Sequence, residues 1–276
     1  MTSASTGEES DSLLRDAWRE DKGTEQRQGA VTLTAFVTAP SQRALRTGLL
    51  LLLTLAAGWT DALCYLAVGR VFASFMTGNI LFVGLSIAQG NTALLVRAVV
   101  AILLFLVSVT LGSLYLQRLP ARQLVARWRG TLAWYLLVEA LILLAFALLW
   151  AITGDPAQHP EMQVVLLGVA ALGMGLQGAL VGAFNIPDVV SIALTGTELL
   201  LGIRLAQRIT RQSADQPGGT SVSFLLALML SYTLAALVVA LVAPWIGLAF
   251  IPCLLVTIAV LVVLVTPKWR RRLGWS

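Results

Sequence analysis

Long apolar runs fill this sequence from about Gly48 to Val265, and they leave few folds open to it. The hydrocarbon core of a bilayer is about 30 Å thick, so a helix needs about 20 apolar residues to cross it. Segments that meet this requirement are 47–69, 93–116, 131–153, 163–184, 222–243 and 245–265. Because lipid tolerates no unpaired backbone, the pattern predicts an all-α, polytopic membrane helical bundle.

The charge content agrees with this interpretation. Only 12% of the residues are charged, whereas a soluble domain carries about 25%. The formal net charge is +5, but the arginines flank apolar segments, so they indicate orientation in a membrane and not nucleic-acid binding. The expected partner is therefore a lipid bilayer.

Two further apolar segments, 72–89 and 187–205, are shorter and interrupted. Each contains a Thr-Gly pair, Thr77-Gly78 in the first and Thr195-Gly196 in the second. An interruption frees backbone groups that hydrocarbon cannot satisfy. We expect these two segments to be re-entrant or broken helices.

Basic residues predict the topology by the positive-inside rule. They flank the first span, crowd the connection 117–130, follow the segment 187–205 and follow the last span. The connection 154–162 has neither Lys nor Arg. This distribution favours six spans, two non-crossing segments and cytoplasmic termini. An eight-span alternative would place the four arginines of 117–130 outside.

The same patterns predict the domain organisation. Residues 1–44 are polar and read as a disordered cytoplasmic tail, 45–267 form the transmembrane domain, and 268–276 form a basic cytoplasmic tail. An internal repeat divides the domain, since 76–84 and 194–202 are identical at four of nine positions. Three spans per half make the repeats, about 45–153 and 162–267, inverted relative to each other.

The helix breaks supply the candidate binding site. A short helix starting near Asn79, and another near Thr197, would each direct free N–H groups and a positive dipole end toward the interior. The alternative is that both breaks are packing kinks. The candidate substrate-binding residues are Asp61, Thr77, Gly78, Asn79, Gln177, Thr195, Gly196 and Thr197.

Ionisable side chains within the apolar segments are costly and suggest function. Asp61 and Arg97 are expected near the same membrane face, where they form an ion pair or Asp61 couples protons. Glu139 has no obvious partner and faces Arg127, Arg129 or a cavity. Glu198 follows the second break and either caps a helix or contributes to the site.

Reactive motifs are not evident, so we expect no enzyme activity, catalytic residue, cofactor or metal. Cys64 and Cys253 lie in apolar segments and read as packing thiols. Residues 173–178 spell a dinucleotide-binding fingerprint, but no strand precedes them, and small-residue helix packing explains them better.

The element Gly58-Trp59-Thr60-Asp61-Ala62-Leu63, followed by Gly69, Phe72 and Met76-Thr77-Gly78-Asn79, resembles the signature of the YoaK-like family of uncharacterised, mainly bacterial membrane proteins. Gly175-Leu176-Gln177 through Leu194-Thr195-Gly196-Thr197 resembles that family's partner motif. The resemblance covers about 45–270. It implies an inner-membrane location with about six spans, and it supplies no substrate.

Three functions remain open from the sequence. The leading hypothesis is a transporter or channel for an unknown small solute, built from two repeats. The alternatives are a membrane enzyme acting on a lipid-borne substrate, and a membrane assembly protein without transport. An oligomer is compatible with all three.

Overall fold

The computed structural model describes residues 43–118, 121–183, 194–209, 221–242 and 246–272, and these contain helices and connections but no strand. The predicted all-α bundle is confirmed for this part of the chain. The expected N-terminal tail lies almost wholly outside the described residues, as does the end of the chain after Arg272.

Within the described residues, six helices are long and apolar enough to cross a membrane, as the sequence predicts. They contain the candidate spans 47–69, 92–118, 130–153, 160–183, 222–242 and 247–265. The helices are α2 (Arg43–Leu63) with its π-helical extension η2 (Cys64–Gly69), α4 (Thr92–Arg118), α5 (Ala121–Thr153), α6 (Pro160–Ala183), α8 (Val222–Val242) and α9 (Ile251–Arg272). Short 3-10 turns, η3 (Pro156–Gln158) and η4 (Ile246–Phe250), precede α6 and α9.

Two of the described helices are too short to span a membrane. They are α3 (Met76–Gln89) and α7 (Leu194–Ile209), of 14 and 16 residues. They occupy the two segments in which the sequence predicts breaks. The breaks, however, do not fall at the Thr-Gly pairs, because Thr77-Gly78 and Thr195-Gly196 both lie in the first helical turn. In the first half the non-helical residues are 70–75, just upstream.

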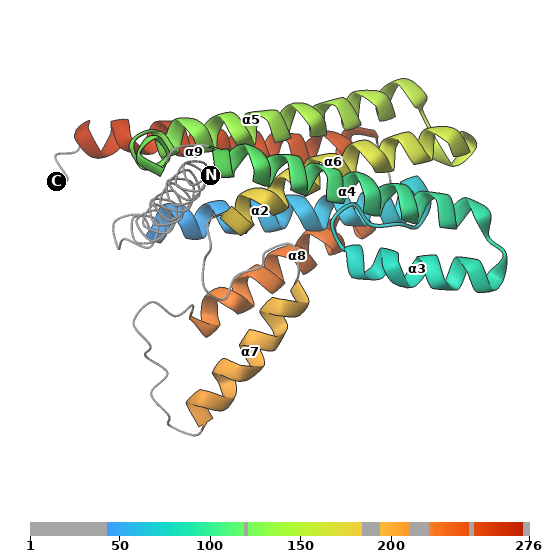
Figure 1. Ribbon diagram of the computed structural model, residues 1–276, viewed down its shortest axis with the longest axis horizontal. Coiled ribbons are helices and arrows are strands. Elements are labelled where there is room, and N and C mark those ends of the chain that lie inside the picture. The colour runs from blue at the N-terminus through green and yellow to red at the C-terminus, as the bar shows by residue number, and fades with distance from the viewer. Residues whose placement is uncertain (1–42, 119–120, 184–193, 210–220, 243–245, 273–276) are drawn as a thin grey trace, which may run out of the picture.

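Helix α6 lies at the centre of the bundle, between α4 and α5, while α2 packs against α8 and α9 (Figure 1). Small residues allow this close packing. A Cβ atom at Gly175 would lie 2.6 Å from the Phe105 carbonyl oxygen of α4. The glycines of 173–178 therefore serve helix contact, as we expect from the sequence.

The outer faces of the long helices are apolar. Large aliphatic side chains lie exposed on the bundle surface, among them Leu103, Leu111, Leu230, Leu241 and Leu261. Such a continuous apolar exterior is incompatible with water and suits lipid. The interior instead contains most of the polar side chains discussed below.

Helix α3 doubles back beside α4. In Figure 1 it begins beside the middle of α4 and ends where α4 begins, at the end of the bundle that η2 reaches. Helix α7 packs against α8 and runs toward the opposite end (Figure 1). The two short helices therefore approach the bundle from different ends.

Candidate functional site

Asp61 is a buried carboxylate at the end of α2 that receives four hydrogen bonds. Its Oδ1 accepts from the backbone N–H groups of Ala73 and Ser74, both at 2.7 Å. Its Oδ2 accepts from the Ser74 hydroxyl at 2.6 Å and the Tyr232 hydroxyl at 2.7 Å. All four partners are donors, so they compensate the cost of burying a carboxylate. Asp61 thereby joins α2, the segment 70–75 and α8.

The side chain of Asn79 also forms hydrogen bonds with the backbone of the segment 70–75. Its Oδ1 accepts from the backbone N–H of Phe72 at 3.0 Å, and its Nδ2 donates to the Phe72 carbonyl at 2.7 Å. The amide of Asn79 thus satisfies both backbone polar groups of Phe72, as a neighbouring backbone would in a sheet. Asp61 and Asn79 together pair the N–H groups of Phe72, Ala73 and Ser74. Irregular backbone at membrane depth requires such internal partners.

The local sequence explains why the helix stops ahead of this segment. The π-helical turn η2 ends at Gly69, and Arg70 adopts a left-handed conformation with φ 61°. A left-handed residue cannot continue a right-handed helix. The chain then runs without helix to Met76, where α3 begins. We call residues 70–75 the anchored loop.

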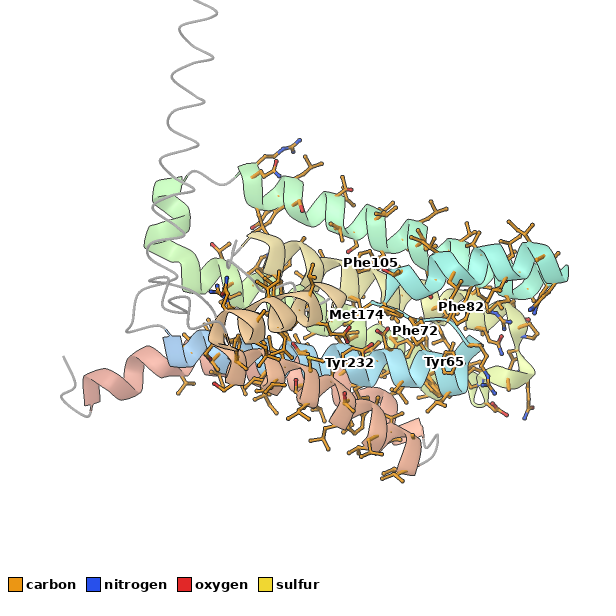
Figure 2. All side chains as sticks on the ribbon, turned by 90° about the horizontal axis from the view of Figure 1, so that it is seen from below. Tyr65, Phe72, Phe82, Phe105, Met174 and Tyr232 are labelled. Atoms are coloured by element: carbon orange, nitrogen blue, oxygen red, sulfur yellow. The ribbon has the colours of Figure 1, made fainter. Side chains whose placement is uncertain are left out.

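Aromatic rings fix α3 against the anchored loop. The rings of Tyr65, Phe72 and Phe82 stack on one another, with centroids 5.1 Å apart for Tyr65 and Phe72 and 5.8 Å apart for Phe72 and Phe82. Figure 2 shows these three labelled side chains gathered at one end of the bundle. The Arg70 guanidinium lies over the Tyr65 ring, 5.6 Å from its centroid. The stack joins η2, the loop and α3.

Gly78 makes room for this aromatic packing. A Cβ atom there would lie 2.6 Å from the Phe75 ring and 2.9 Å from the Phe72 ring. Gly78 has no left-handed φ, so its role is space and not backbone freedom. Thr77 beside it is exposed at the first turn of α3.

The expected ion pair between Asp61 and Arg97 is wrong. Arg97 donates instead to the Gln163 side chain on α6, and Gln163 donates to the Pro156 carbonyl at 3.0 Å. Asp61 is paired by Tyr232 because α2 and α8 approach closely at Gly58, where a Cβ atom would lie 2.7 Å from the Tyr232 carbonyl oxygen. The sequence patterns do not predict Tyr232 as this partner.

The candidate residues of the second half lie on α7. Thr197 is buried, and its hydroxyl has no hydrogen-bond partner in the described part of the chain. Gly196 is half-buried, Glu198 is exposed, and the Thr195 side chain lies outside the described residues. No hydrogen bond within the described ranges joins this group to Asp61 or Asn79. The structure therefore gathers Asp61, Thr77, Gly78 and Asn79 around the anchored loop.

The two remaining polar candidates, Gln177 and Glu139, are also buried. Gln177 on α6 donates through Nε2 to the Leu53 carbonyl of α2 at 2.9 Å. Glu139 on α5 is fully buried, and both its oxygens lack a hydrogen-bond partner among the described residues. The side chains of Arg127 and Arg129, its expected neighbours, lie outside the described part. No group of three His, Cys, Asp or Glu side chains able to hold a metal occurs in the described ranges.

Comparison with known proteins gives a family match over most of the chain. A family described as "Protein of unknown function (DUF1275)" matches residues 49–265. The chain is also similar to the UPF0700 transmembrane protein YoaK of Bacillus subtilis (strain 168), with 30% identity over 154 residues. That alignment covers 56% of this chain and 64% of the relative, so it spans less than two thirds of the relative's length. No solved structure matches.

Proposed function

The chain belongs to the DUF1275 family of proteins of unknown function, and from this premise we propose that it is a multi-pass transporter or channel for a small polar solute. The similarity to a transmembrane protein and the six apolar helices support the membrane part of this proposal. The proposal of transport rests on the interior of the bundle.

The anchored loop is the observation that carries the proposal. Non-helical backbone at membrane depth occurs where it is buried in protein or lines a water-filled path. Here six residues interrupt the bundle, and a buried carboxylate is used to hold them. Transporters repeatedly place such broken helices beside their substrate sites. Burying a carboxylate and irregular backbone costs free energy, which a purely structural contact between helices would not require.

Helix α3 supplies the chemistry of recognition. Its N-terminus lies beside the middle of α4, so its dipole directs positive charge into the bundle (Figure 1). Thr77 is exposed in the first turn, next to Gly78. N–H groups and a hydroxyl at a helix start suit a polar or anionic solute. In this proposal Asp61 and Asn79 position the loop, and the first turn of α3 contacts solute.

The second short helix would play the matching role. We propose that α7, with Thr195, Gly196 and Thr197 in its first turn, is the inverted counterpart of α3. The approach of α3 and α7 from different ends of the bundle supports this arrangement (Figure 1). The repeats would then be about 45–153 and 162–267. The unpartnered Thr197 hydroxyl would be the polar group that this half offers.

Reconstitution tests the proposal. Purified protein in liposomes is screened for uptake of small anions and metabolites, and protein-free liposomes give the background. We expect one class of solute to enter with the wild type and at least tenfold more slowly with Asp61→Asn, Asn79→Ala and Thr77→Ala. Asp155→Asn, Asn91→Ala and Thr92→Ala are matched controls, because all three residues are exposed in connections or at a helix start.

Size-exclusion profiles in detergent separate a lost site from a lost fold. Thr77→Ala is the decisive variant, since Thr77 is exposed and its loss leaves the anchored loop intact. Unchanged flux in all three site variants would contradict the proposed site. A wild type that moves none of the solutes tested would favour an assembly role instead.

A further inference from the structure

Glu139 is the most isolated polar group in the described bundle. It lies in the middle of the inward face of α5, which is otherwise apolar around it, with Leu136, Ala140 and Leu143 buried on either side. It has no exposed surface, and neither carboxyl oxygen has a hydrogen-bond partner among the described residues. A buried carboxyl of this kind is either protonated or compensated by a bound positive charge.

Helix packing places Gln177 opposite Glu139. Helices α5 and α6 form an antiparallel hairpin (Figure 1), and a Cβ atom at Gly173 would lie 3.1 Å from Leu143. Residues four apart share a face of a helix. One turn back along α5 from Leu143 is Glu139, and one turn forward along α6 from Gly173 is Gln177. The carboxyl and the amide therefore occupy the same level of the interface.

The amide oxygen of Gln177, at the same level as Glu139, is available to a ligand. Its Nε2 is engaged with the Leu53 carbonyl at 2.9 Å, while its Oε1 has no partner in the described part. Thr54, next to Leu53, is buried with an unpartnered hydroxyl. The hydroxyl of Tyr135, one turn from Glu139, lies instead against Gly112 of α4. The unsatisfied oxygen atoms at this level therefore belong to Glu139 and Gln177.

An ionised carboxylate and an amide oxygen can only accept hydrogen bonds, so a proton or a cation between them would compensate both. Along the described part of α6, the one charged residue is Glu161, more than four turns from Gln177. The described side chains of η4 and α9, 247–265, carry no charge. Carboxylate, amide and hydroxyl oxygens are the ligands that hard cations prefer. One carboxylate matches one positive charge.

We propose that Glu139 and Gln177 form an interior site for a single positive charge, either a proton or a monovalent metal cation. The site is separate from the anchored loop, since Asp61 follows Leu53 by eight residues, about 12 Å along α2. The site goes beyond the proposed function, because its occupancy exists whether or not the protein moves a solute. In a transporter it would hold the coupling ion.

A carbodiimide experiment tests the site directly. Dicyclohexylcarbodiimide enters apolar environments, adds a protonated carboxyl across its C=N bond, and rearranges to a stable N-acylurea. Purified wild-type protein in sodium-free detergent buffer is treated and analysed by peptide mass spectrometry. We expect an adduct at Glu139, absent in Glu139→Gln and retained in Asp155→Asn, whose carboxylate is exposed.

Adding sodium, potassium or lithium distinguishes the two ligands. If a metal cation occupies the site, saturating cation lowers the labelling of Glu139 at least fivefold, and Gln177→Leu abolishes that protection. If a proton occupies it, labelling is independent of the cations. Both results support the site. Folded wild-type protein that gives no adduct at Glu139 under any of these conditions overturns it, because water or protein groups would then satisfy an ionised carboxylate. The assay measures no flux, so its failure is distinct from failure of the transport proposal.

Discussion

The hydroxyl of Tyr232 donates a hydrogen bond of 2.7 Å to the Asp61 carboxylate, although 171 residues separate them in the sequence. Asp61 belongs to the first span and Tyr232 to the fifth. The same carboxylate holds the anchored loop through Ala73 and Ser74. One side chain therefore connects the interruption in the first half of the chain to a helix in the second half.

Removing the tyrosine hydroxyl should weaken this connection. In Tyr232→Phe, Asp61 Oδ2 keeps the Ser74 hydroxyl but loses its other donor. We expect destabilisation of about 1–3 kcal/mol, as for a hydrogen bond to a charged group. Thermal unfolding in detergent measures the loss. Tyr115→Phe is the matched control, because Tyr115 is exposed on α4. A Tyr232→Phe protein as stable as the control would show that the bond contributes nothing.

The approach of α2 to α8 should be sensitive to a single methyl group. Gly58→Ala would place a Cβ atom 2.7 Å from the Tyr232 backbone oxygen, which cannot rotate away. We expect a loss of about 1–3 kcal/mol from forced separation of the helices. Gly48→Ala, on the same helix with no atom within 4 Å, should be neutral or slightly stabilising. Equal melting temperatures for the two variants would contradict the close packing.

Asn79 and Asn91 should respond oppositely to aspartate. Asn79 both accepts from and donates to the Phe72 backbone, whereas Asn91 only accepts, from the Leu94 N–H at the start of α4. Aspartate cannot donate when ionised, so Asn79→Asp loses a bond and places charge against a carbonyl. Asn91→Asp keeps its bond and suits a helix N-terminus.

Amide hydrogen exchange of the anchored loop measures the difference between the two variants. In Asn79→Asp we expect the amides of Phe72, Ala73 and Ser74 to exchange at least tenfold faster, because the anchored loop opens more often. In Asn91→Asp the same peptide should exchange at the wild-type rate. Slow exchange of the loop in both variants would mean that Asn79 does not hold it.

Orientation is a further prediction from the basic residues. We expect the connection 117–130 in the cytoplasm and 154–162 outside, with both termini cytoplasmic in the inner membrane of a bacterium. Alkaline phosphatase and fluorescent-protein fusions at the two connections would report their sides. An external 117–130 would rule out this orientation of the six-span arrangement.

Span lengths were predictable because hydrophobic thickness imposes a simple requirement on sequence. All six spans differ from expectation by at most a few residues at their ends. The two short helices were also predictable, since they are the apolar segments that fail this requirement. The sequence predicts the start of α3 near Asn79, after a break at Thr77-Gly78, whereas the helix begins three residues earlier, at Met76. Gly78 instead provides space for Phe72 and Phe75, which depends on rings folded over the helix.

Partners of the buried charges were not predictable in the same way. The sequence predicts Arg97 as the partner of Asp61 because both are expected near one membrane face. Depth within the membrane does not determine which helices are neighbours, and the contact of α2 with α8 selects Tyr232 instead. The level shared by Glu139 and Gln177 likewise depends on the register of α5 against α6. A single sequence contains no record of that register.

The hydrogen bonds of the anchored loop have a consequence for biosynthesis. The loop leaves the ribosome with Asp61 and Asn79, but Tyr232 is translated about 150 residues later. Until the fifth span is inserted, the Asp61 carboxylate lacks one of its four hydrogen-bond donors. A nascent chain released before Tyr232 would therefore lack one of the four donors that compensate this buried acid.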